Sequence, residues 1–250
     1  MDNGIWATWY DLADDANSPG RDAFLDWLHG DYLPEIQSKA GIAWAAHYQI
    51  TGGGTKMQAI HDRLVHAEVE GVGTGTQFLM LVGATSPHVF FDPRIDEWEK
   101  SLGEPAKSML ARRVGTRTCI FTTEEFVTGP EFDARPAGST PGPAIQMGSF
   151  RTKSVEDEFD LAAWYAQYRL PHMSRMPGCI ATRKLVSIAS WAKHSVMYEF
   201  TSLEARQQHF QNHESLALDD TVWTNKIITY TIHAPGSPSV GKRLWPPVDN

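Results

Sequence analysis

A histidine and a tyrosine in the first fifth of the chain could together carry out acid–base chemistry. His47 falls in the apolar segment 41–50, where strand alternation places it on the same face as the small Ala45. An imidazole that faces a roomy, aromatic-walled pocket can act as a general base, because its unperturbed pKa is about 6.5. Tyr10, at the end of an earlier apolar segment, can donate a hydrogen bond to a developing oxyanion. We therefore predict His47 as the catalytic base.

Three further catalytic candidates, His29, Asp31 and Tyr32, lie in segment 24–36, whose apolar residues recur at helical spacing. They would shape or polarise the same pocket. The structural alternative is that His47 is a hydrogen-bonded core residue and that His29 is solvated on the surface of its helix.

The residues predicted to bind substrate are mostly cationic and lie mostly in the second half of the chain. Guanidinium groups hold carboxylates well, so this half could recognise an acidic substrate. The alternative is a basic strand edge that prevents aggregation. The candidates are Arg169, Arg183, His172, His194 and Trp44.

Two fifteen-residue segments, 27–41 and 164–178, carry the same landmarks at a constant offset of 137 residues, which indicates an internal repeat. The aligned pairs are Trp27 with Trp164, Leu33 with Leu170, Pro34 with Pro171 and Gly41 with Gly178. Each proline should bend its helix, or end it and begin a short second piece. Each glycine suits the turn into the next strand.

Both halves predict the order strand, helix, strand, strand, helix, strand, which is the ferredoxin-like βαββαβ arrangement. The predicted strands are 4–12, 41–50, 76–85 and 116–127 in the first half, and 144–150, 178–188, 194–200 and 222–233 in the second. The second helix of each half is predicted at 96–113, broken near Gly103 and Pro105, and at 203–218.

The domain prediction follows from this repeat. Residues 1–127 form the first unit, with an insertion at 52–75, and residues 144–234 form the second. Residues 128–143 are a Pro/Gly-rich linker. Residues 235–250 are a tail without a regular element, which Trp245 ties to the surface.

A ferredoxin-like sheet has helices on one face only, so two units can bury their bare faces against each other and form an α+β barrel. With its Leu-Pro helix motif and the following strand, the chain resembles the dimeric α+β barrel superfamily. It is most similar to EthD-like and antibiotic-biosynthesis-monooxygenase-like members, here fused in tandem. Members often carry a histidine two residues before the helix proline, where this chain has Tyr32 and Arg169.

The resemblance implies a site in the cleft between sheet and helices or inside the barrel. It also implies a choice among cofactor-free monooxygenases, cyclases, isomerases, lyases and haem enzymes. We favour a cofactor-independent lyase or isomerase that acts on a small aromatic, carboxylated metabolite. One alternative is a cofactor-free monooxygenase or a haem enzyme with His47, His172 or His194 as axial ligand. The other is a non-catalytic small-molecule-binding protein.

Composition narrows the possible partners. The net charge is −8 and no lysine or arginine run occurs, which argues against nucleic acid. No apolar run is long enough to span a membrane, and the N-terminus lacks a signal-peptide pattern. Cys119 and Cys179 have no metal spacing, so we expect buried thiols, a cytoplasmic location and no metal site. We expect a monomer or a homodimer.

Overall fold

Eight strands form a closed antiparallel barrel. The computed structural model describes residues 2–52, 64–134, 141–210 and 222–248. The strands follow the order β10-β2-β4-β1-β5-β7-β8-β6, and β6 pairs back with β10 to close the ring. Their bounds are β1 Gly4–Leu12, β2 Ile42–Ile50, β4 Phe78–Ala84, β5 Arg113–Thr128, β6 Ala144–Thr152, β7 Cys179–Ala189, β8 His194–Phe200 and β10 Ser239–Trp245. The short β9 (Thr231–His233) pairs with β6, and β3 (Val65–His66) pairs with β9.

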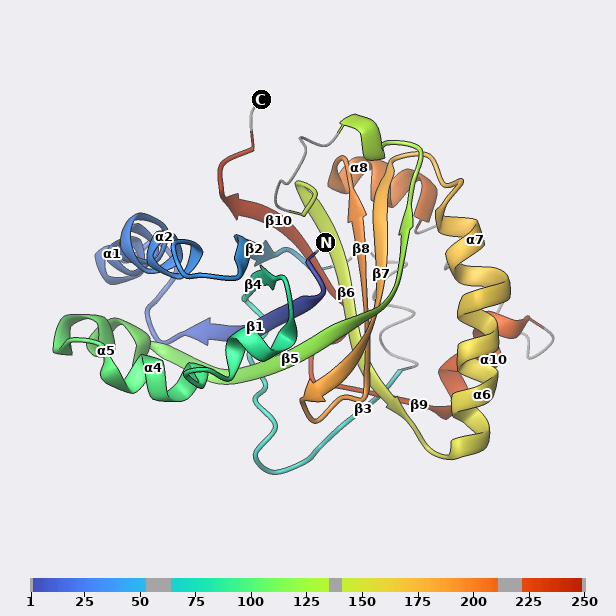
Figure 1. Ribbon diagram of the computed structural model, residues 1–250, viewed down its shortest axis with the longest axis horizontal. Helices are drawn as coiled ribbons and strands as arrows, with labels where there is room; N and C mark the ends of the chain where they lie inside the picture. Colours follow the sequence, from blue (N-terminus) through green and yellow to red (C-terminus); the bar gives the residue numbers. More distant parts are fainter. Residues whose placement is uncertain (1, 53–63, 135–140, 211–221, 249–250) are drawn as a thin grey trace.

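Helices flank the barrel on two opposite sides (Figure 1). In the first half these are α1 Pro19–Trp27, η1 Leu28–Tyr32, α2 Leu33–Gln37, η2 Pro87–Phe90, α4 Ile95–Ser101 and α5 Glu104–Leu110. In the second half they are α6 Val155–Trp164, η4 Tyr165–Arg169, α7 Leu170–Met173, α8 Leu203–Ala205, η5 Arg206–Phe210 and α10 Trp223–Tyr230, after the short η3 Phe132–Ala134.

The strand pairing has the same pattern in both halves. It runs β5-β1-β4-β2 in the first half and β9-β6-β8-β7 in the second. Strand β5 is long enough to pair with β1 of its own half and with β7 of the other (Figure 1). The predicted mixed α+β class and the barrel are confirmed.

Two predictions for the second half are wrong. Residues 223–230 are a helix, and only residues 231–233 of the predicted strand 222–233 are extended. Residues 239–245, expected to be an irregular tail, form β10, which closes the barrel between β2 and β6. Trp245, expected to tie the tail to the surface, lies in this strand and pairs with His47 of β2. Parts of the predicted insertion, linker and helix 203–218 lie outside the described residues.

The two helix prolines act in the same way in both halves. Each helix passes through one π-helical segment, Leu28–Tyr32 or Tyr165–Arg169, and proline follows at the start of the next α-helical piece. Proline is tolerated there because the first residues of a helical turn need no backbone donor. The π segments widen the helix directly beside the sheet, at Tyr32 and Arg169.

The interior of the barrel is filled by apolar side chains from both halves. They include Trp9, Tyr48, Phe121 and Met147, each at most 1% exposed. The two bare sheet faces therefore bury each other as predicted, but they leave a packed core. Any substrate site must lie outside the barrel, between the strands and their helices.

Candidate functional site

Three of the predicted catalytic residues form a chain of hydrogen bonds on the outer face of the first half. The Tyr10 hydroxyl lies 2.9 Å from Nε2 of His47, and Nδ1 of His47 lies 2.8 Å from Nε2 of His29. Tyr10 comes from β1, His47 from β2 and His29 from the π segment, so strand alternation and the widened helix bring them together. A consistent proton assignment has Tyr10 donating to His47, which then donates to His29.

Burial controls the protonation of this chain. It lowers the pKa of His47 well below its usual value, with His29 and Arg113 adding to the shift. It also lowers the pKa of His29 to about 4, against an opposing effect of Asp26, and raises that of Tyr10 well above the usual value. Both imidazoles are therefore neutral near pH 7 and resist protonation in the folded state.

Tyr32, the fourth candidate, belongs to an adjoining cluster. Its hydroxyl donates to Oε1 of Glu99 at 2.6 Å, and Nη1 of Arg113 lies 3.7 Å from the same oxygen. The Arg113 guanidinium also lies 4.7 Å from the ring centre of Tyr10 and 5.2 Å from that of Tyr32. Sequence reasoning missed Arg113 and Glu99, since neither has a local motif. Asp31 is exposed, so it stands apart from this cluster.

Aromatic side chains fill the space expected beside His47. Phe78 lies 5.1 Å from its ring and Phe24 lies 6.0 Å from that of Tyr10. With His47 0% exposed and both of its ring nitrogens hydrogen-bonded, the chain forms a buried relay whose outer end is His29.

Two predicted substrate-binding residues lie inside one end of the barrel. Arg183 pairs with Asp2 at 2.9 Å and lies 3.6 Å from Glu199. Trp44 donates from Nε1 to the same Asp2 carboxylate at 2.6 Å. The charge of Arg183 is thus neutralised by internal carboxylates, and we assign both residues to holding the barrel end together.

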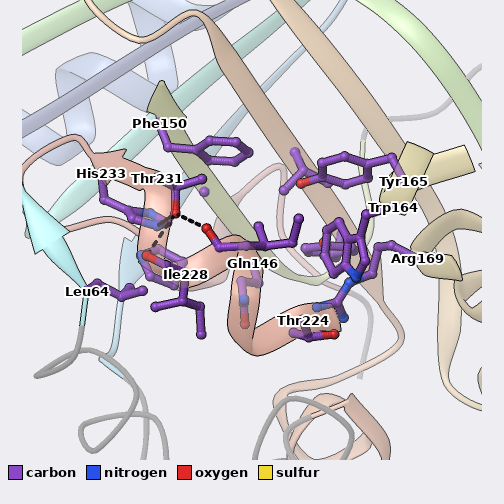
Figure 2. Close-up of a pocket in the computed structure, with 15 residues that line it drawn as sticks. Leu64, Gln146, Phe150, Trp164, Tyr165, Arg169, Thr224, Ile228, Thr231 and His233 are labelled. Atoms are coloured by element: carbon purple, nitrogen blue, oxygen red, sulfur yellow. Dashed lines mark hydrogen bonds between the residues drawn. The ribbon is translucent and has the colours of Figure 1, made fainter. Parts of the chain in front are cut away.

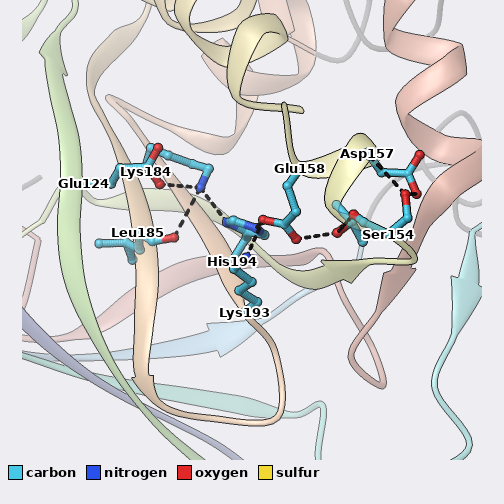
Figure 3. A network of polar contacts seen from close by, with 9 residues as sticks. Glu124, Ser154, Asp157, Glu158, Lys184, Leu185, Lys193 and His194 are labelled. Atoms are coloured by element: carbon cyan, nitrogen blue, oxygen red, sulfur yellow. Dashed lines mark hydrogen bonds and ion pairs between the residues drawn. The ribbon is translucent and has the colours of Figure 1, made fainter. Parts of the chain in front are cut away.

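His194 belongs to a polar network in the second half (Figure 3). Its Nδ1 lies 3.0 Å from Nζ of Lys184 and its Nε2 lies 2.7 Å from Glu158, while Lys184 also donates to Glu124 at 2.8 Å. Burial lowers the pKa of His194, with Lys184 adding to the shift and Glu158 opposing it. Lys184 occupies the position that aligns with His47, so the two halves place different chemistry at equivalent sites.

A pocket of about 100 Å³ opens between the outer face of the second-half sheet and its helices (Figure 2). Arg169 lies in its wall, 3% exposed, with its guanidinium 4.7 Å from the ring centre of Trp164 and 5.3 Å from that of Phe210. In Figure 2 this group points toward Thr224 of α10. Of the predicted binding residues, Arg169 is the one placed in this wall, while His172 lies on α7, partly exposed.

The other polar residues of the pocket were missed by sequence reasoning. Gln146 from β6, Tyr165 from the π segment, Tyr198 from β8 and His233 from β9 share the wall with Arg169. Tyr165 could have been found from the repeat, because at the offset of 137 residues it aligns with Leu28, four residues before Arg169, which aligns with Tyr32. His233 could not, because α10 was taken for a strand.

Two of the three predicted axial histidines, His47 and His194, have no ring nitrogen left for a haem iron. His47 and His194 each have both ring nitrogens in hydrogen bonds of 2.7–3.0 Å, and neither lines the pocket. Within the described residues, no group of three or more His, Cys, Asp or Glu side chains is placed to hold a metal ion. No helix among them is long and apolar enough to cross a membrane.

Comparison with solved structures identifies the fold. No family model and no curated protein sequence matches the chain. An anthrone oxidase-like protein superposes with a TM-score of 0.53 at 10% identity, over 98% of this chain and 92% of the other. A chlorite dismutase-like protein superposes with a TM-score of 0.55 at 10% identity, over 98% of this chain and 96% of the other. A monooxygenase-like protein from Fusobacterium nucleatum superposes with a TM-score of 0.53 at 8% identity, over 97% of this chain and 93% of the other. The chain therefore shares the overall fold of these three proteins.

Proposed function

We propose that the protein is an oxidoreductase that oxidises a small hydroxylated aromatic compound with O₂ without a cofactor, in the pocket of its second half. The observation that carries this proposal is Arg169, a buried cation in a pocket walled by Trp164, Tyr165 and Tyr198. Such a pocket suits an aromatic ring, and its cation suits the ring's ionised oxygen. The likeness to oxidase-like and monooxygenase-like folds supports oxidation, and it gives no support to the lyase or isomerase that the sequence favoured.

Cofactor-free oxidation needs a substrate that can itself reduce O₂. An ionised hydroxyaromatic ring with an activated methylene group can do so. The overall reaction is R₂CH₂ + O₂ → R₂C=O + H₂O, in which the carbon gives up four electrons and O₂ accepts four. One oxygen atom enters the product and the other leaves as water. The protein must favour the anion, orient it and exclude water.

We assign these roles to residues in the pocket wall. Arg169 holds the substrate anion, and the apolar rings strengthen that attraction by excluding water. His233, whose Nε2 lies 3.2 Å from the Thr231 hydroxyl, is the proposed acceptor of the substrate proton. His47 remains a predicted base for a ligand in the first half, where the relay would carry its proton outward through His29.

We also propose that the chain consists of two ferredoxin-like repeats and that it belongs with the antibiotic-biosynthesis-monooxygenase-like members. The matching strand orders support two ferredoxin-like repeats, and the monooxygenase-like neighbours support a place among the antibiotic-biosynthesis-monooxygenase-like members.

The test is O₂ uptake by the purified protein with a panel of anthrones that carry the required methylene group and differ in their ring hydroxyl groups. We expect Arg169→Gln to lower kcat/KM by about 100-fold, the cost of losing a buried charge-assisted contact. Arg151→Gln, at an exposed arginine, is the control. An absorption spectrum with a Soret band, or substrate oxidation that is unaffected by Arg169→Gln, would contradict the proposal.

A further inference from the structure

A second and larger cavity lies in the first half, on the outer side of β1 and β2. Its volume is about 580 Å³, within the range of small-molecule sites. Its walls come from β1, the end of α2, the start of β2, η2 and α4. They include Trp6, Lys39, Ala40, His88, Phe90 and Trp98.

The walls of this cavity are aromatic and held in place from behind. Trp6 and Phe90 meet edge to face at 6.0 Å and are 3% and 4% exposed. Trp98 packs against the ring of Tyr32 at 5.4 Å. Gly41 has φ of +84°, and a Cβ there would lie 2.8 Å from Val89, so only glycine lets η2 close on β2. The cavity is therefore preformed, which lowers the entropy cost of binding.

The charged groups at the cavity favour an anion on an otherwise apolar ligand. Nζ of Lys39 lies 4.4 Å from the ring centre of Trp98, directly against the aromatic wall. Oε1 of Glu35, a half-exposed residue, lies 3.8 Å from the same Nζ. An exposed ion pair of this kind contributes little to stability, so a ligand carboxylate can replace Glu35 as the partner of Lys39. Asp92, the acidic lining residue, is exposed to solvent, where its repulsion is screened. His88 completes the polar part of the lining.

We propose that this cavity binds a planar aromatic carboxylate, with its ring among Trp6, Phe90 and Trp98 and its carboxylate on Lys39. The site is separate from the pocket of the second half and does not depend on the function proposed for it. It lies beside the Tyr32–Arg113 cluster, because Trp98 is both its wall and the ring neighbour of Tyr32.

The test compares 2-naphthoate with its neutral analogue 2-naphthol by isothermal titration calorimetry on the full chain. We expect the wild type to bind naphthoate more tightly. Lys39→Gln should weaken naphthoate about fivefold, to the level of naphthol, and leave naphthol unchanged, as expected for a partly exposed ion pair of about 1 kcal/mol. Lys100→Gln, at a highly exposed lysine of α4, is the matched control and should change neither.

A second pair of variants locates the bound ligand. Ala40→Trp fills the cavity from an exposed position, where it should not disturb folding, and should abolish binding of both compounds. Arg169→Gln alters the other pocket and should leave the affinity for naphthoate unchanged. The proposal is overturned if the wild type binds neither compound, if Lys39→Gln leaves naphthoate affinity intact, or if Arg169→Gln rather than Ala40→Trp removes binding.

Discussion

Nδ1 of His47 lies 2.8 Å from Nε2 of His29, so a partly exposed histidine on a helix is joined directly to a fully buried one on a strand. One imidazole must donate to the other, and the Tyr10 hydroxyl occupies the remaining nitrogen of His47. The arrangement links solvent to the centre of the first-half core through neutral groups. The stability of the folded state depends on those groups staying neutral.

The histidine pair should make the protein sensitive to acid. Burial lowers the pKa of both His29 and His47 in the folded state, to about 4 for His29, from an unfolded value of 6.5. Below about pH 6.5 the unfolded chain therefore binds protons that the folded chain excludes. We expect the free energy of unfolding to fall as the pH is lowered from about 6.5 towards 4, measured by urea denaturation at each pH.

The double variant His29→Gln/His47→Gln should flatten this acid dependence, whatever it does to stability at pH 7. His209→Gln, at a partly exposed histidine of η5, is the control and should retain the slope of the wild type. An unchanged slope in the double variant would show that other groups cause the acid sensitivity.

Tyr10→Phe should destabilise the fold by about 1–3 kcal/mol, because it leaves Nε2 of buried His47 without its hydrogen bond. The aromatic ring is retained, so the loss of stability measures the contribution of the hydroxyl alone. A denaturation midpoint equal to that of the wild type would argue against a strong Tyr10–His47 bond.

The relay could be predicted from sequence because each of its members sits in a clear element. The apolar segments 4–12 and 41–50 form strands at Gly4–Leu12 and Ile42–Ile50 in the structure. Alternation then puts Tyr10 and His47 on one face. The role of Arg113 could not be predicted, because it depends on where a strand 100 residues further along begins.

The errors have a common physical cause, which is that tertiary contacts override local preference. Segment 222–233 is rich in Ile, Thr and Tyr and so resembles a strand. It folds as α10 because Thr224, Ile227 and Tyr230, three residues apart, bury one face of a helix on the second half. Strand β10 is short and follows a Pro/Gly-rich segment, and only the open edges of β2 and β6 give it partners.

Glu158 should govern stability at lower pH. Burial acts to raise its pKa, but hydrogen bonds from Lys193, Thr152 and His194 prevail and hold it at about 2 (Figure 3). The folded state thus keeps this carboxylate ionised more readily than the unfolded chain does. Its stabilising effect is present above about pH 4.5 and is lost as the pH falls towards 2. Glu158→Gln should remove that part of the acid transition in circular dichroism, whereas Glu156→Gln, exposed on the same helix, should not.

Two glycines should respond in opposite directions to alanine. Gly178 has φ of +78°, and a Cβ there would lie 2.7 Å from that of Ala205, so Gly178→Ala should cost about 1–2 kcal/mol or more. Gly30 lies in the π segment with nothing within 4 Å of the Cβ position. Gly30→Ala should stabilise the protein by about 0.5–1 kcal/mol. Thermal denaturation of both variants checks the pair, and a stabilising Gly178→Ala would contradict the turn geometry.

Strand β10 should be essential for a closed barrel. Its removal, by ending the chain at residue 238, would expose the backbone edges of β2 and β6 and break the bond from Trp9 Nε1 to the Ser239 hydroxyl at 3.0 Å. Open edges of two long strands are templates for pairing with other chains. We therefore expect the truncated protein to form aggregates or edge-paired oligomers, detected by size-exclusion chromatography with light scattering. Ending the chain after Pro246 keeps every β10 pairing and the acceptor of Arg243, so that protein should behave as the full chain does. A monodisperse, fully stable product ending at residue 238 would mean that the barrel does not need β10 to close it.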